Sequence, residues 1–172
     1  ARRVIEDSIV RAVASRVKSA EADRELTEEG LFLVWAEIDE LKRLNQAEHQ
    51  AYEGSDLHGA IRLSGDFHLQ LAEYGGNPIL AGFLRELVSR SSLIIALYQS
   101  PGGSDCAFDE HEKIIDALAA GDGETAAQEM RAHLRQIESR LNLTEPEAEP
   151  IALRDVFAKF AGAAAPSARK RH

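Results

Sequence analysis

The sequence predicts an all-α protein, an antiparallel bundle of six to seven helices. Apolar residues recur at steps of three and four along most of the chain, which is the period of an amphipathic helix. No segment alternates apolar and polar residues over a useful length, so no half-buried strand is expected. The links between the periodic segments are short, which favours antiparallel packing of consecutive helices.

The length and composition of the chain limit the classes of protein to which it can belong. A chain of 172 residues with 44% hydrophobic content fits one soluble domain with a real core. It contains no run of roughly 18 apolar residues, so we expect no membrane span. The net charge of −9 argues against nucleic-acid binding by this segment. A single cysteine excludes an internal disulfide and fits a cytoplasmic location.

The N-terminus has no apolar segment typical of a signal peptide, and the chain starts inside a helical pattern without an initiator methionine. We therefore expect a fragment of a longer protein. The first helical pattern covers residues 4–17 and the second covers 27–53. A third helix follows Gly54, with Ser55 or Asp56 as its N-cap, and ends at a cluster in which Asn77 is interpreted as a C-cap residue.

The second half of the chain holds the remaining helices. The fourth helix starts at Pro78 and is apolar nearly all round towards its end, so we expect it to be the central, most buried element. A fifth helix is predicted over about 107–120, and a sixth, capped by Asp122, to about Leu143. Residues 144–150 are predicted to be a linker, and 151–172 a short helix with a basic tail.

Three of the six histidines, His68, His111 and His133, lie on predicted apolar helix faces. Each buried imidazole needs partners for both of its ring nitrogens in an interior without water. One such residue is more often a hydrogen-bonded core histidine. Three of them, on three helices of one bundle, indicate a site for a divalent metal ion such as Zn²⁺ or Ni²⁺. His49 and His58 have polar neighbours and are expected to be solvated.

Other kinds of chemistry find little support. Gly75-Gly76 lacks the flanking strand of a phosphate-binding loop. The residues three before the candidate ligands are Gly65, Phe108 and Met130, so the Glu-x-x-His pattern of di-iron bundles is absent. Periodicity places no carboxylate beside the histidines to act as a general acid or base. We therefore expect that the protein is not an enzyme.

Three segments, in this order, resemble signatures of a known family. They are Asp66-Phe67-His68 with Gly76-Asn77-Pro78, then Glu110 to Asp122, then Ala126 to Leu134. Together with the opening Arg2-Arg3-Val4-Ile5-Glu6, they are similar to the FadR C-terminal (FCD) effector domain of GntR-type bacterial transcription regulators. The resemblance covers residues 1–143. It implies a bundle of six or seven helices in which three histidines, here His68, His111 and His133, bind a metal that helps to hold a small carboxylic acid.

The resemblance has one departure. The family's usual fourth ligand, an aspartate one turn before the first histidine, is replaced by Ser64. Asp66 lies about 200° around the helix from His68 and should point elsewhere. A three-histidine site would then attract an anionic effector or water, and the alternative is that metal binding has been lost. Arg2 occupies a family position that can clamp the effector's carboxylate, although an exposed residue at a frayed helix end is equally compatible.

The leading hypothesis is an effector-sensing and dimerisation domain of a cytoplasmic GntR/FadR-type regulator. Its winged-helix DNA-binding domain would precede Ala1, and it would act as a homodimer, with the fourth or the final helix as candidate contact. Arg2 and Ser64 are the candidate effector-binding residues. Two alternatives stay open: a small three-histidine metallohydrolase, and a metal-free structural dimerisation domain.

Overall fold

The computed structural model describes residues 1–22, 28–98 and 107–142, which fold into one compact unit, Ala1–Asn142. Within this part the all-α prediction is confirmed, and no strand occurs there. The six helices are α1 (Arg2–Ala22), α2 (Glu28–Glu53), α3 (Leu57–Tyr74), α4 (Pro78–Tyr98), α5 (Ala107–Ala119) and α6 (Gly123–Ser139). None of them is long and apolar enough to cross a membrane. The predicted linker and final helix lie outside the described residues.

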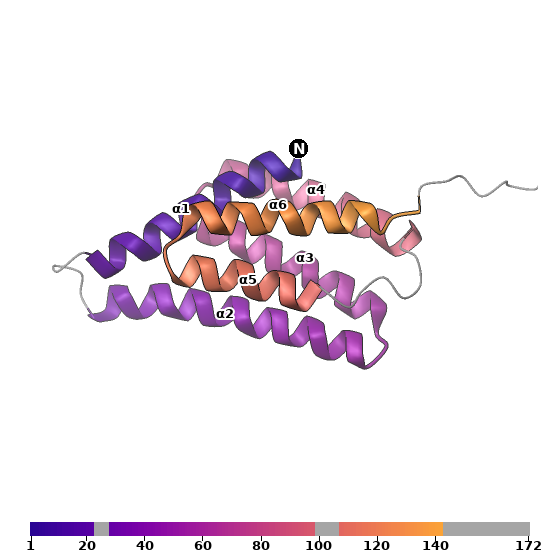
Figure 1. Ribbon diagram of the computed structural model, residues 1–172, viewed down its shortest axis with the longest axis horizontal. Helices are drawn as coiled ribbons and strands as arrows, with labels where there is room; N and C mark the ends of the chain where they lie inside the picture. The colour runs from indigo at the N-terminus through magenta and orange to yellow at the C-terminus, as the bar shows by residue number, and fades with distance from the viewer. Residues whose placement is uncertain (23–27, 99–106, 143–172) are drawn as a thin grey trace, which may run out of the picture. The chain divides into compact units, whose positions relative to one another are not determined.

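The helices pack side by side in an order that differs from their order along the chain. Helix α6 contacts α1 and α5, α5 also contacts α2, and α2 contacts α3, which packs on α4. Helix α1 closes the arrangement because it touches α3, α4 and α5 as well as α6. The colour gradient of Figure 1 shows that α2 and α3 run antiparallel, and that α5 and α6 do the same. The bundle therefore brings α1, α3, α5 and α6 around a common interior.

Side-chain caps define where α3 and α4 begin. Asp56, and not Ser55, is the N-cap of α3, because its carboxylate accepts a hydrogen bond of 2.9 Å from the amide of Gly59. The interpretation of Asn77 as a C-cap was wrong. Its side-chain oxygen accepts hydrogen bonds of 3.1 and 3.2 Å from the amides of residues 79 and 80, so Asn77 caps the start of α4.

The turn between α5 and α6 is tight. Gly121 has a φ of 64°, and a Cβ built there would lie 3.0 Å from the Cβ of Lys18 on α1. Glycine is therefore required both by the backbone conformation and by the close approach of α1. Asp122 follows as the predicted N-cap of α6, and accepts a hydrogen bond of 3.0 Å from the amide of Thr125.

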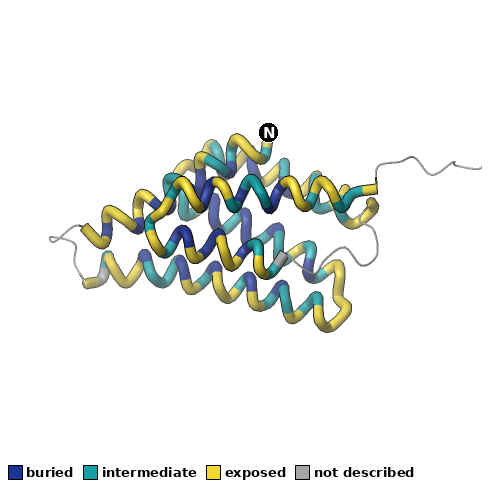
Figure 2. The backbone as a smooth tube through the Cα atoms, viewed as in Figure 1, coloured by how far each residue is buried: buried dark blue, intermediate teal, exposed yellow. Residues whose placement is uncertain are grey.

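The core lies between the inward faces of the helices, as the dark blue segments of Figure 2 show. Its apolar members come from every described helix, and they surround a small polar group that includes three histidines and two glutamates. The buried polar residues are Glu6, Asn45, Glu48, His68, His111 and His133. Buried polar groups of this kind need hydrogen-bond partners, since an unpaired polar group is costly in the interior.

The prediction that the fourth helix is the most buried was wrong. Only Ala81, Leu84 and Val88 of α4 are buried, whereas much of its remaining apolar surface is exposed. Helix α4 packs on α3 and α1 through one face, so the apolar residues on its other face have no partner within the described part of the chain.

Candidate metal centre

Three histidines from three helices converge at one point in the core. His68 of α3, His111 of α5 and His133 of α6 are at most 2% exposed. The Nε2 atom of His133 lies 3.2 Å from the Nε2 of His68 and 3.2 Å from the Nε2 of His111. One ligand atom from each of the three residues can be chosen so that all lie within 4.8 Å of one another. The structure thus brings together the three histidines that periodicity singled out.

A carboxylate lies behind each imidazole, on the Nδ1 side. Nδ1 of His68 is 2.6 Å from Glu6, Nδ1 of His111 is 2.9 Å from Glu48, and Nδ1 of His133 is 2.7 Å from Glu110. The Glu6 contact is short, but neither Glu6 Oε2 nor His68 Nδ1 has a hydrogen-bond partner among the described residues. At 2.6 Å the Glu6 carboxylate would attract a proton on Nδ1, whereas two bare lone pairs would repel one another.

These carboxylates select the tautomer of each histidine. An ionised carboxylate can only accept a hydrogen bond, so the imidazole proton sits on Nδ1 and the lone pair sits on Nε2. All three Nε2 lone pairs then point at the same small volume. Without a cation or a proton between them they would repel one another.

The spacing of the three nitrogens suits a metal ion. Two ligand nitrogens about 2.1 Å from one Zn²⁺ at a tetrahedral angle lie about 3.4 Å apart. The two Nε2 separations of 3.2 Å are close to that value. The carboxylates behind the rings are the outer partners that metal-bound histidines usually have. Among the described residues the group contains no fourth ligand from cysteine, aspartate or glutamate.

The interior favours the neutral form of two of the imidazoles, those of His68 and His133. Burial lowers the pKa of His133 well below 6.5, and the neighbouring His111 and His68 lower it further. Burial also lowers the pKa of His68, although Glu6 opposes that shift. For Glu6 itself burial alone would raise the pKa, but His68 and Arg2 outweigh it and hold the pKa at about 2. Neutral imidazole is the form that binds metal.

These shifts predict that the metal-free protein loses stability as the pH falls below about 6.5. The unfolded chain protonates its histidines near that pH, whereas buried His68 and His133 stay neutral, so protons favour unfolding. Each such histidine contributes up to about 1.4 kcal/mol per pH unit. The free energy of unfolding, measured with urea in the presence of a chelator between pH 8 and pH 5, checks this. A flat profile over that range would contradict it, and replacing exposed His58 by alanine should leave the slope unchanged.

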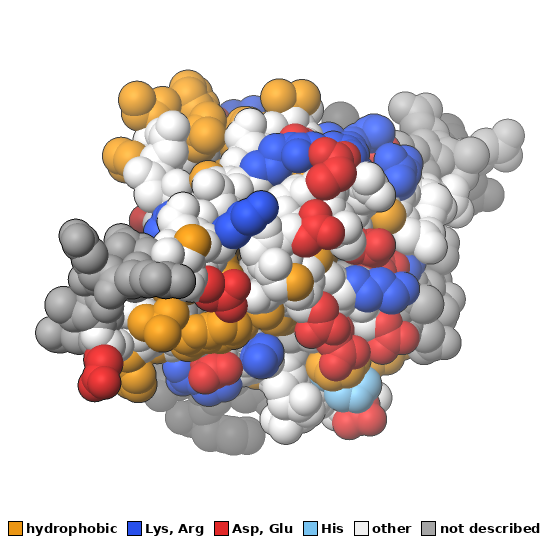
Figure 3. Space-filling model, turned by 60° about the vertical axis from the view of Figure 1, so that its left-hand side comes forward, with side chains coloured by type: hydrophobic (Ala, Val, Ile, Leu, Met, Phe, Trp, Pro, Cys, Tyr) orange, Lys and Arg blue, Asp and Glu red, His pale blue; other side chains and the backbone are white. Residues whose placement is uncertain are grey.

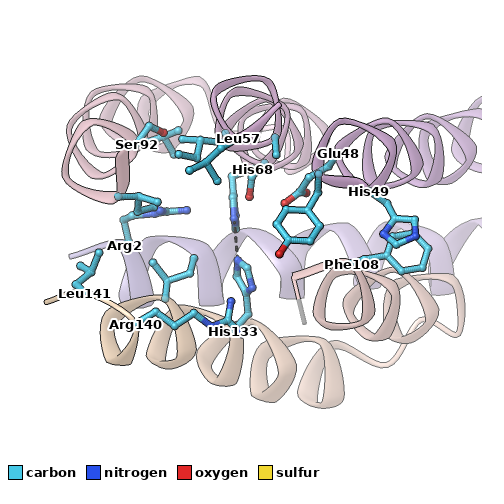
Figure 4. Close-up of a pocket in the computed structure, with 18 of the residues that line it drawn as sticks. Arg2, Glu48, His49, Leu57, His68, Ser92, Phe108, His133, Arg140 and Leu141 are labelled. Atoms are coloured by element: carbon cyan, nitrogen blue, oxygen red, sulfur yellow. Dashed lines mark hydrogen bonds between the residues drawn. The ribbon is translucent and has the colours of Figure 1, made fainter. Parts of the chain in front are cut away.

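A cavity of about 300 Å³ opens beside the histidines. His68 and His133 line it, whereas fully buried His111 lies behind them. Figure 4 shows the rings of His68 and His133 pointing toward one another, with Arg2 and Arg140 on one side of the cavity. Its wall is mostly apolar, with residues such as Leu57, Ile61, Val88, Ile95, Ile137 and Leu141. The cavity therefore joins a cationic end to an apolar wall, next to the three histidines.

Arg2 is the most constrained cationic group at this cavity. Its Nε donates a hydrogen bond of 2.6 Å to Glu6, and one terminal nitrogen donates a hydrogen bond of 2.9 Å to Ser91. The other terminal nitrogen is buried and has no hydrogen-bond partner among the described residues. A buried donor left without a partner is costly, and indicates that an oxygen atom of a ligand can complete it. Arg2 is thus not an exposed residue at a frayed helix end.

The structure also shows where the other residues considered in the sequence analysis lie. Ser64 lies one turn before His68 and lines the cavity. Asp66 points away from the centre, as predicted, and pairs with Arg62 at 2.8 Å. His49 is 34% exposed, and it also lines the cavity, where its ring centroid lies 4.4 Å from that of Phe108. His58 is exposed, as expected.

Sequence reasoning missed the three carboxylates Glu6, Glu48 and Glu110. It also missed Arg140, which forms an ion pair with Glu110 at 2.8 Å. The sequence did contain part of the information needed to find Glu6. Glu6 continues the stripe of Ile9 and Val13 on α1, and an acidic residue on a core stripe needs a buried partner. The expectation that no carboxylate lies beside the histidines was wrong, because it considered each helix by itself.

The fold and the centre together define a helical bundle with a three-histidine core and an adjoining cavity. A family model, described as "FCD domain", matches residues 35–136, which is more than half of the chain. This chain belongs to the FCD domain family, and the resemblance to the FCD domain of GntR-type regulators is confirmed.

Two similar proteins extend the comparison. The chain is 33% identical over 82 residues to the HTH-type transcriptional regulator LutR of Bacillus subtilis (strain 168). That match spans 44% of this chain and 37% of LutR, so it covers less than half of the regulator's length. The solved structure of E. coli McbR/YncC matches with a TM-score of 0.57 and 20% identity, over 80% of this chain and 66% of that one. At this identity, the second match shows the shared fold alone.

Proposed function

We propose that this domain is the sensory part of a cytoplasmic transcription regulator, and that it binds a small carboxylic acid at a divalent metal held by His68, His111 and His133. The observation that carries the proposal is the convergence of three buried Nε2 atoms, each with a carboxylate behind its Nδ1. The similarity to LutR supports the regulatory role, since that protein is an HTH-type transcriptional regulator. The DNA-binding domain would precede Ala1, and the regulator would act as a homodimer.

The chemistry of the cavity supports a carboxylate effector. When bound, Zn²⁺ or Ni²⁺ would supply a positive charge that attracts an anion to the centre. Arg2 offers a buried, unpartnered N–H to a second oxygen of the ligand, and Ser64 offers a hydroxyl from the wall. The apolar wall would contact the body of the acid. The effector would act by binding one arrangement of the helices more tightly than another.

The two alternatives receive less support. A metallohydrolase would need a carboxylate free to move protons at the metal, but Glu6, Glu48 and Glu110 each engage the Nδ1 of a histidine. A metal-free structural domain would have to tolerate three converging lone pairs, with Nδ1 protons fixed by the same carboxylates. Neither alternative accounts for the unpartnered nitrogen of Arg2 beside a cavity.

Elemental analysis of protein purified without a metal-chelating column tests the proposal. We expect about one equivalent of Zn²⁺ or Ni²⁺ per chain, and loss of that metal in His111→Ala, because two imidazoles bind a dication far less tightly than three. His58→Ala removes an exposed histidine and serves as the matched control, with unchanged metal content.

The metal-loaded protein should then show a higher melting temperature with one or more members of a panel of small carboxylic acids. An acid at one hundred times its Kd stabilises the fold by about 2.7 kcal/mol. The shift should be absent after chelation. If neither the parent nor His111→Ala contains metal, and none is taken up on addition, the metal-sensor mechanism is overturned.

A further inference from the structure

Helix α4 has two apolar faces, and only one of them is explained by the fold. The inner face contributes Ala81, Leu84 and Val88 to the core. The outer face carries large exposed residues, among which Ile79 is 69% exposed and Leu97 is 67% exposed. Figure 3 shows that hydrophobic side chains on the surface gather in patches amid intermixed charges. An exposed apolar patch of this kind usually marks an interaction site.

The outer residues form one continuous stripe along the helix. At 100° per residue they fall within an arc of about 100°, directly opposite Val88. A single ion pair between Glu86 and Arg90 interrupts the apolar residues at the middle of the helix. We call these residues the α4 stripe, and they are Ile79, Phe83, Glu86, Arg90, Leu93, Ile94 and Leu97.

The chemistry of the α4 stripe is symmetric about its middle. Ile79 and Leu97 lie equally far on either side of Val88, and so do Phe83 and Leu93. Glu86 and Arg90 are also equally spaced about that residue, but with opposite charge. An antiparallel copy of the same helix would therefore place apolar residues opposite apolar residues, and acid opposite base. A parallel copy would instead set like charges against each other.

We propose that α4 pairs antiparallel with α4 of a second copy of this chain, across a two-fold axis at the level of Val88. In this pairing Glu86 of each copy faces the partner's Arg90, and the apolar ends of the stripe cover each other. The contact is isologous, since the same surface is used by both copies. The proposal rests on the homodimer of the proposed function and adds its surface and register.

Gly82 provides an independent observation. It is exposed within α4, and a Cβ added there would meet nothing within 4 Å. Glycine weakens a helix relative to alanine, and no contact within the described part of the chain requires it. Gly82 borders the stripe on the side where the partner's Leu93 would lie. The missing side chain lets a second helix approach closely at that point.

The same helix also connects the proposed contact to the cavity. On its inner side Val88, Ser92 and Ile95 line the cavity, and Ser91 accepts a hydrogen bond from Arg2. A ligand that changes the position of Arg2 would therefore act on the helix that forms the two-fold contact. The α4 stripe and the cavity-lining residues lie on different faces of this one helix.

Charge reversal at the α4 stripe tests the pairing in the full chain. We expect the parent to be a dimer by sedimentation, and Glu86→Arg and Arg90→Glu each to weaken dimerisation at least about tenfold, because like charges then face each other. An equimolar mixture of the two variants should regain the parent's affinity as a heterodimer, since every facing pair is again of opposite charge. Both side chains are more than 60% exposed, so folding should be unaffected.

Arg85→Glu is the matched control, because Arg85 lies on the same helix, is exposed, and pairs with Glu73 away from the stripe. It should dimerise like the parent. Single variants that dimerise as tightly as the parent, or a mixture that stays dissociated, would overturn the α4 pairing while leaving a homodimer intact. A monomeric parent would overturn both the pairing and the homodimer, whereas metal content and acid binding test the sensor role separately.

Discussion

Glu6→Ala is expected to destabilise the metal-free bundle by about 3 to 5 kcal/mol, because it leaves two buried groups without their charged partner. Glu6 is 1% exposed and contacts Arg2 at 2.6 Å and His68 at 2.6 Å. Its pKa of about 2 indicates how strongly those two groups favour the ionised carboxylate. The free energy of unfolding, measured with urea at pH 7.5 in the presence of a chelator, checks the prediction.

Glu138→Ala is the matched control. Glu138 of α6 likewise forms an ion pair with an α1 arginine, Arg3 at 2.7 Å, but both of these side chains are about half exposed. An exposed pair contributes at most about 1 kcal/mol, since water screens it. If the two variants lose the same small amount of stability, the buried network around Glu6 contributes nothing net to the fold.

Glu48→Ala is expected to lower Zn²⁺ affinity by about 10-fold to 100-fold although all three histidines stay in place, if the proposed metal site is correct. Glu48 is buried, and its carboxylate lies 2.9 Å from the Nδ1 of His111. Without it, His111 can carry its proton on Nε2, where that proton blocks metal binding. Competition with a chelating dye measures the affinity.

Glu53→Ala serves as the control for Glu48→Ala. It removes an exposed carboxylate from the same helix, one that lies 3.4 Å from His49 and is not among the carboxylates that contact the three histidines. It should change Zn²⁺ affinity by less than about threefold, because exposed charges interact weakly. Equal affinities of the parent and Glu48→Ala would mean that the carboxylate does not orient His111.

Helix positions and the three histidines could be predicted because they depend on local sequence. Turn chemistry at Asp56, Gly76 and Asp122 fixes where helices start and stop within a few residues. The helical period places His68, His111 and His133 on inward stripes, and a single helix suffices to show this for each residue. Membership of the FCD domain family was likewise recognisable from ordered short segments.

The partners of those residues could not be predicted, because they come from helices far apart in the chain. Glu6 reaches His68 from α1, and Glu48 reaches His111 from α2. Which inward residue meets which depends on how the helices pack side by side, and the sequence of one helix carries little information about that. The unpartnered nitrogen of Arg2 appears only when α1 is packed on α4.

Helix α4 shows most clearly which features the sequence determines and which depend on the tertiary structure. Its sequence determined an apolar helix from Pro78 to Tyr98, and apolarity on nearly all sides suggested complete burial. Only the tertiary structure decided that α4 packs on the bundle through one face and exposes the other. Periodicity reports which side chains avoid water, but it cannot say whether the same chain or another copy covers them. By itself the sequence determined the helices and the inward histidines; packing decided their carboxylate partners, the cavity and the face that α4 leaves exposed.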